Sequence, residues 1–207
     1  MTDQQTLDLY STKAHEYAAQ YEQGQRQDFQ ARLLNIFPQG STLLEIGCGS
    51  GADAACLLRN GRQILATDAS AEMLTEAVKY HPELKGNTLN LIWPARLVNI
   101  SDHHFDGIFS TAVLMHFQRP ALIATLTESS RVLKIGGTFM LGIFDARDDL
   151  DTTGRDRSGR YYELPKQADL MAVFSDAGFK CTRTYAVEDA LGRAGMKQRE
   201  YVFEKIV

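Results

Sequence analysis

The chain has 207 residues, and 44% of them are hydrophobic, which is enough to form the core of one globular domain. Its 22 basic and 26 acidic residues give a net charge of −4, which argues against a general affinity for nucleic acid or anionic membranes. Its three cysteines lack the spacing of a disulfide framework or zinc site, its His, Asp and Glu residues form no metal-ligand pattern, and no run has the apolar length of a signal peptide or membrane span. We therefore expect a cytoplasmic protein without a metal or a membrane partner.

The first 40 residues predict helices. Apolar and aromatic residues recur at spacings of three and four between 7 and 21, which predicts an amphipathic helix that carries Tyr10, Tyr17 and Tyr21. A second helix is predicted over 26–37 and ends before Pro38, because the residue ahead of a proline avoids the α region.

From residue 41 onward, predicted strands alternate with predicted helices. The strands fall at 41–46, 62–68, 88–93, 105–110 and 137–144, and the helices at 52–60, 70–80 and 120–133. This alternation predicts parallel strands joined by right-handed crossovers, with helices on both faces of the sheet. Only eleven residues separate Trp93 from Phe105, which is too few for a crossover helix, so a loop or a single turn is expected there.

The last third of the chain predicts a different ending for the sheet. Residues 145–160 are charged and irregular, a helix is predicted over 165–177, and two β-rich stretches follow at 179–187 and 199–206. Two strands without a helix between them form a hairpin most simply, so one strand must run antiparallel. The predicted fold class is α/β: a Rossmann-like doubly wound sheet, mostly parallel, with a final antiparallel strand from a C-terminal hairpin.

Three glycines follow the strand at 41–46 in the segment "LLEIGCGSG". Gly47, Gly49 and Gly51 permit positive φ angles and allow a ligand to approach the backbone. A tight turn without a ligand is one alternative. A dinucleotide site is another, but it requires G-x-G-x-x-G, and the third glycine here comes one position too early.

Two carboxylates help to decide between these alternatives. Glu45 stands two residues ahead of the glycines, where it would repel a pyrophosphate and attract a ligand that carries a sulfonium and an ammonium. Asp68 ends the next strand, where an acid can accept hydrogen bonds from ribose hydroxyls. Together they favour an adenosine cofactor with a positively charged end.

Four motifs, "LLEIGCGSG", "ATDASAEML", "FDGIFSTAVLMHF" and "RVLKIGGTFML", together resemble the class I S-adenosylmethionine-dependent methyltransferases, in order and spacing, from about residue 41 to 144. The resemblance implies that the cofactor is S-adenosyl-L-methionine and the product S-adenosyl-L-homocysteine. The cofactor-binding residues that it implies are Glu45, Gly47, Gly49 and Gly51 at the methionine moiety, Asp68 at the ribose, Ala69 and Met73 at the adenine, and Ser110 and Thr111 again at the methionine end.

The chain departs from the family pattern at one position. Members often carry an acid shortly after the third strand, where it binds the adenine amino group, and Pro94 stands near that position here. Proline offers neither a carboxylate nor an N–H. Our hypothesis is that adenine is held by packing against Trp93 or Met73 and by the backbone of Ala95 and Arg96.

Methyl transfer from a sulfonium requires alignment above all, and a general base only when the acceptor keeps its proton. The segment "TAVLMHF" places Met115 and His116 at the carboxyl end of the sheet, and His116 is the candidate base because its ordinary pKa lies near 6.5. The alternative is a histidine that only packs or binds backbone.

Further substrate-binding residues are predicted on either side of the cofactor. Arg157, Arg160 and Tyr161 belong to the charged stretch 145–165, which either presents arginines to an anionic acceptor or is a self-compensating solvated loop. Tyr10, Tyr17 and Tyr21 either cover the pocket as part of a lid or only pack.

The leading interpretation is one methyltransferase domain over 1–207 that methylates an oxygen or nitrogen of a small metabolite, with an anionic metabolite as one alternative. Its parts are a helical lid at 1–40, a cofactor-binding core at 41–144, a substrate-side insertion at 145–165, and a helix with a closing hairpin at 165–207. The alternatives are a methyltransferase that acts on RNA or protein, a protein that binds S-adenosylmethionine without catalysis, and a nicotinamide enzyme. The sequence specifies neither the acceptor nor the oligomeric state.

Overall fold

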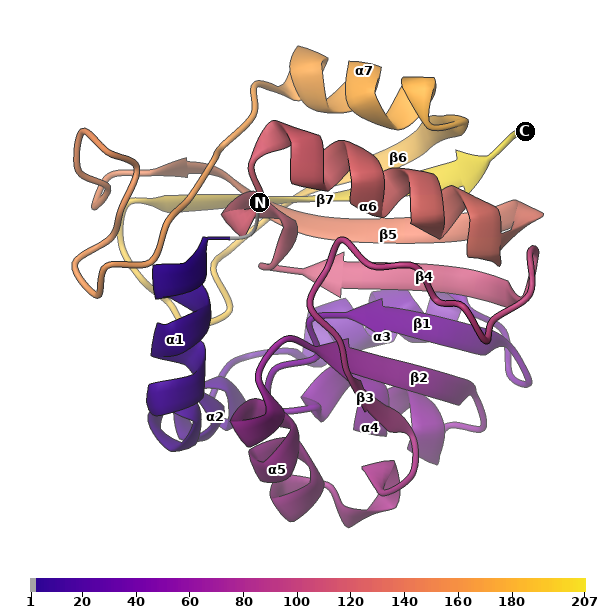
Figure 1. Ribbon diagram of the computed structural model, residues 1–207, viewed down its shortest axis with the longest axis horizontal. Helices are drawn as coiled ribbons and strands as arrows, with labels where there is room; N and C mark the ends of the chain where they lie inside the picture. Colours follow the sequence, from indigo (N-terminus) through magenta and orange to yellow (C-terminus); the bar gives the residue numbers. More distant parts are fainter. Residues whose placement is uncertain (1–2) are drawn as a thin grey trace.

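A computed structural model describes residues 3–207 and has at its centre a seven-stranded sheet of order β3-β2-β1-β4-β5-β7-β6 (Figure 1). Its neighbouring strands are parallel except for β7, which runs antiparallel to both β5 and β6. The strands are β1 (Thr42–Ile46), β2 (Gln63–Asp68), β3 (Thr88–Asn90), β4 (Phe105–Thr111), β5 (Leu133–Arg147), β6 (Phe179–Val187) and β7 (Met196–Lys205). The predicted Rossmann-like fold with an antiparallel C-terminal strand is confirmed.

Helices cover both faces of this sheet, and each face has its own apolar core. The helices are α1 (Gln4–Thr12), α2 (Ala14–Glu22), α3 (Gln27–Ile36), α4 (Ala52–Arg59), α5 (Ala71–Tyr80), α6 (Arg119–Val132) and α7 (Gln167–Asp176). One core cluster joins α3, α4 and α5 to the sheet, and the other joins α6 and α7 to its opposite face. Figure 1 shows α1 and the 145–165 segment beyond the carboxyl ends of the parallel strands, the edge at which open α/β sheets bind their ligands.

The helix predicted over 7–21 is instead two helices, which break at Lys13 (φ −112°, ψ 21°). Both halves contact α5, α2 more extensively than α1. The start of α1 is also bound to the 145–165 segment: the Asp3 carboxylate caps α1 and forms an ion pair with Arg155, and the Thr6 hydroxyl accepts a hydrogen bond from the backbone N–H of Tyr161. The spacing of the apolar residues therefore predicted which side of these helices is buried, but not the break between α1 and α2 at Lys13.

The third strand is shorter than predicted. β3 ends at Asn90 on the edge of the sheet, and the chain then turns so that the Trp93 side chain is buried in the core. The chain between Trp93 and Phe105 contains no helix, as the spacing predicted. Within residues 3–207, no helix is long and apolar enough to cross a membrane.

Candidate active site

A cavity of about 600 Å³ lies at the carboxyl ends of β1, β2 and β4. The glycine turn after β1 forms part of its lining, and α1, α2 and the β6–β7 hairpin complete it. Of the residues predicted for cofactor and substrate, the cavity brings together Tyr10, Tyr21, Glu45, Gly47, Gly49, Asp68, Ala69, Met73, Thr111, Met115, His116 and Arg160.

The glycine turn needs its glycines for different reasons. Gly47 has a φ of +77°, and a Cβ there would lie 2.3 Å from a methyl carbon of Val113, so this glycine lets two loops pack together. Gly49 has a φ of +54°, and a Cβ there would meet the Tyr21 ring at 3.4 Å beside the cavity. Gly51 precedes α4 and faces Leu84, away from the cavity lining.

Glu45 is the most constrained acid of the site. Its side chain is buried at the end of β1, and its Oε2 atom has no hydrogen-bond partner among the described residues. Burial raises the pKa of this carboxyl well above its ordinary value, the nearby Asp53 carboxylate raises it further, and Arg26 opposes both. A buried acid without a partner is costly unless a ligand supplies one.

Arg26, which precedes α3, also lines the cavity. Its Nη1 atom donates to the Asp53 carboxylate, while its Nε atom is buried without a partner among the described residues. Asp53 in turn accepts from the Gln30 amide at 3.1 Å. The sequence analysis missed Arg26, and the only available signal was the acid in the first turn of α4, which needs a cation if it is buried.

Asp68 at the end of β2 is held by backbone donors. Its two carboxylate oxygens accept from the N–H groups of Gly49 at 2.9 Å and Ser70 at 3.0 Å. Burial raises its pKa to about 6, although these hydrogen bonds favour the ionised form. Beside it, Met73 and the buried Trp93 form an apolar wall of the cavity.

The other half of the cavity contains a buried histidine. The Nδ1 atom of His116 lies 2.6 Å from the Tyr161 carbonyl oxygen, and its Nε2 atom lies 3.1 Å from the Tyr10 hydroxyl. Desolvation by burial lowers the pKa of His116 to about 4, with a smaller contribution from the positive charge of Arg160.

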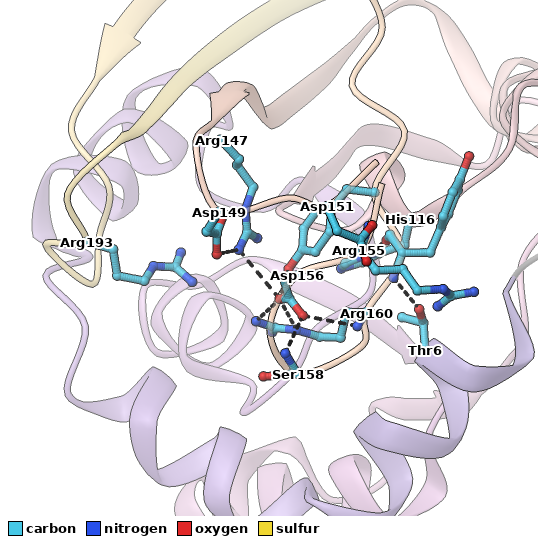
Figure 2. A network of polar contacts seen from close by, with 12 residues as sticks. Thr6, His116, Arg147, Asp149, Asp151, Arg155, Asp156, Ser158, Arg160 and Arg193 are labelled. Carbon is cyan, nitrogen blue, oxygen red and sulfur yellow. Dashed lines mark hydrogen bonds and ion pairs between the residues drawn. The ribbon is translucent and has the colours of Figure 1, made fainter. Parts of the chain in front are cut away.

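Arg160 reaches the same place from the 145–165 segment. Its guanidinium forms an ion pair with Asp156 at 2.7 Å and donates a long hydrogen bond of 3.4 Å to the Tyr10 hydroxyl. It lies 5.1 Å from the centre of the Tyr17 ring and 5.9 Å from that of Tyr162. Figure 2 shows Asp156 between Arg160 and Arg147, the latter at 3.5 Å.

The other predicted residues lie outside the cavity lining formed by residues 3–207. The Ser110 hydroxyl is buried and donates to the Ile46 carbonyl, and Arg157 is exposed to solvent. Tyr17 packs behind Arg160, and Tyr161 contributes its carbonyl oxygen to His116. Also outside this lining are Gly51, Ala95 and Arg96.

The β6–β7 hairpin adds a wall that the sequence analysis did not anticipate. Residues 186–191 line the cavity, as does Arg193, whose guanidinium pairs with both oxygens of Asp189. Arg32 on α3 makes a similar two-bond contact with Glu200 on β7. Each of these arginines therefore has its charge matched by a carboxylate.

Comparison with known proteins agrees with this geometry. Residues 44–141 match the model of a family described as a methyltransferase domain. The chain is 25% identical over 154 residues to 2-methyl-6-phytyl-1,4-hydroquinone methyltransferase from Synechocystis sp., covering 74% of this chain and 46% of that protein. It is 32% identical over 112 residues to protein-L-isoaspartate O-methyltransferase 2 from Nitrosospira multiformis, covering 52% and 53%. The chain thus spans about half the length of these curated relatives.

Among solved structures, the chain resembles 1,6-didemethyltoxoflavin-N1-methyltransferase from Burkholderia thailandensis with a TM-score of 0.75 and 17% identity, over 97% of this chain and 87% of that one. The sheet order and the glycine turn with its acid agree with the match of residues 44–141 to a methyltransferase domain. Residues 44–141 are thus similar to a methyltransferase domain, and the likeness of the whole chain to the solved structure is one of fold.

The buried state of His116 predicts a measurable pH dependence. Its pKa is lower in the folded protein, about 4 against 6.5, so the unfolded chain takes up a proton first as the pH falls, and folding stability is lost from about pH 6.5 toward 4. Between pH 7 and 5, the wild type should lose about 2 kcal/mol more unfolding free energy than His116→Gln, which does not titrate there. Urea unfolding at both pH values measures this, and equal losses would contradict the buried neutral imidazole.

Proposed function

We propose that the chain is an S-adenosylmethionine-dependent methyltransferase that modifies an oxygen or nitrogen of a small molecule. The observation that carries the proposal is the buried Glu45 carboxylate, whose Oε2 atom has no partner within residues 3–207, beside a glycine turn that leaves space for a ligand. A phosphate-bearing cofactor would be repelled at this place, whereas an ammonium or sulfonium would be attracted.

The residues present fit this cofactor. Its methionine end carries an ammonium and a carboxylate, for which Glu45 and Arg26 supply partners of opposite charge on one side of the cavity. Asp68 would accept hydrogen bonds from the ribose hydroxyls, and Met73 with Trp93 would pack on the adenine. When bound, the cofactor supplies a methyl group on a positively charged sulfur.

The acceptor would occupy the half of the cavity that contains Tyr10, Met115 and His116. The cavity volume of about 600 Å³ suits a small molecule, and α1 and the hairpin restrict water, which favours an in-line displacement. One relative is named for a phytyl hydroquinone and one structural neighbour for 1,6-didemethyltoxoflavin, and both of these are ring compounds.

The arrangement of charges does not favour the anionic acceptor suggested by the arginine-rich segment. Arg160 is paired with Asp156, Arg193 with Asp189, and Arg157 is exposed outside the cavity lining. Because Arg160 and Arg193, which line the cavity, are each matched by a carboxylate, we propose a neutral acceptor.

The fit of the cofactor predicts proton release on binding. Glu45 holds a proton more readily than an ordinary carboxyl, and a bound ammonium would favour its ionised form. Calorimetry of S-adenosylhomocysteine binding at pH 7, in two buffers of different ionisation enthalpy, should show release that disappears in Glu45→Gln. That variant should also bind about tenfold more weakly.

Two further variants serve as controls for this measurement, one expected to lose binding and one expected to keep it. Gly49→Val should abolish binding, because it places a side chain in the space beside Tyr21. Glu76→Gln, at an acid of α5 outside the described cavity lining, should bind like the wild type. Unchanged affinity in both Glu45→Gln and Gly49→Val would place the cofactor elsewhere.

The class of acceptor is tested by label transfer. Purified protein incubated with S-adenosylmethionine labelled in its methyl group and a cell extract should place the label in a small molecule, detected by mass spectrometry. If the label appears in RNA or in protein, that macromolecule is the methyl acceptor and the small-molecule proposal is wrong. Tight binding with no label anywhere would indicate a binding protein without catalytic activity.

A further inference from the structure

The hydrogen bonds of His116 fix which of its nitrogen atoms carries the proton. The Tyr161 carbonyl oxygen, 2.6 Å from Nδ1, can only accept, so Nδ1 must donate. With its pKa lowered by burial, the ring is neutral near pH 7, and Nε2 is left with a lone pair. That lone pair faces the Tyr10 hydroxyl at 3.1 Å, so Tyr10 donates its only proton to His116.

The Tyr10 oxygen is then an acceptor toward everything else. A phenolic oxygen has two lone pairs, and Arg160 Nη1, which can only donate, approaches it at 3.4 Å. The Tyr21 hydroxyl also interacts with Tyr10 and can donate to the second lone pair, beside the cavity that both tyrosines line. A ligand that takes the place of the Tyr21 hydroxyl can donate a hydrogen bond to Tyr10 but cannot receive one from it.

Tyr10 also lies near the proposed position of the cofactor. The Tyr21 ring would contact a Cβ on Gly49, which places it over the glycine turn. Burial raises the pKa of the Tyr21 hydroxyl well above its ordinary value, and the adjacent Tyr10 hydroxyl contributes to the rise. The two tyrosines therefore connect the glycine turn with the His116 end of the cavity.

We propose that Tyr10 is the catalytic residue that contacts the methyl acceptor, and that the site selects acceptors whose reacting atom carries a proton, an O–H or N–H group rather than a carboxylate. This proposal rests on the proposed function and narrows its substrate class. His116 is the positioning residue that directs the lone pair of Tyr10 toward the acceptor.

The proton transfer balances without any further reagent. As the acceptor oxygen or nitrogen forms its bond to the methyl carbon and the sulfur–carbon bond breaks, the acceptor proton moves to Tyr10, and the Tyr10 proton moves to His116 Nε2. The imidazolium so formed carries the proton to be released to solvent. Its charge faces Asp156 as well as Arg160 and Arg147, with Tyr162 packed against its ring.

Two probes of matched size test the selection of acceptors. Phenol donates through its O–H group, whereas benzoate at pH 7 can only accept. With the protein saturated with S-adenosylhomocysteine, saturation-transfer NMR should show that phenol binds the wild type more tightly than benzoate. Phenol binding should weaken at least about fivefold in Tyr10→Phe and remain unchanged in Tyr80→Phe, at an exposed tyrosine of α5.

A second measurement needs no acceptor. Long-range proton–nitrogen NMR spectra of the wild type should show His116 protonated at Nδ1, and the Nε2 shift should change in Tyr10→Phe. A proton on Nε2, benzoate binding as tight as phenol binding, binding of neither probe, or unchanged phenol binding in Tyr10→Phe would each overturn the proposal. A chain that binds S-adenosylhomocysteine but fails these tests keeps the proposed function, whereas one that does not bind it loses that function whatever the probes show.

Discussion

The burial of the Glu45 carboxylate is the constraint on which the rest of the site depends. Burying an acid beneath a turn of glycines, with one oxygen atom that lacks a partner in the described part of the chain, is destabilising in itself. Arg26 and Asp53 compensate only in part, since Asp53 itself repels Glu45 while Arg26 attracts it. The arrangement becomes favourable when a cation is bound, so the unfavourable burial of the Glu45 carboxylate indicates that the ligand carries a positive charge.

A second set of buried charges organises the opposite wall. Arg160 is held by Asp156 and lies among tyrosine rings contributed by α1, α2 and the 145–165 segment. The same segment is tied to the start of α1 through Asp3 and Arg155. The N-terminal helices are therefore fixed over the cavity by polar contacts as well as by apolar packing, and they carry Tyr10 to His116.

The features of the site that the sequence predicts are those formed by residues that lie close together in the chain. Glu45, the glycine turn and Asp68 lie within 24 consecutive residues, so their spacing alone specifies that they meet. Tyr10 and His116 are 106 positions apart. The sequence suggested a role for each residue, but it did not predict that the two are in contact. The positions of Arg26 and of the predicted C-terminal hairpin at the cavity were not foreseen, because only the closed fold brings them there. Arg157 and Ser110 show the converse: a suitable residue in a suitable segment can still point to solvent or bond to backbone.

The most direct test is a crystal structure of the protein with S-adenosylhomocysteine. The account predicts that the ligand's ammonium lies within hydrogen-bonding distance of Glu45, that its ribose hydroxyls are bound by Asp68, and that its sulfur points toward Tyr10. A ligand bound elsewhere, or one whose carboxylate rather than ammonium faces Glu45, would contradict it.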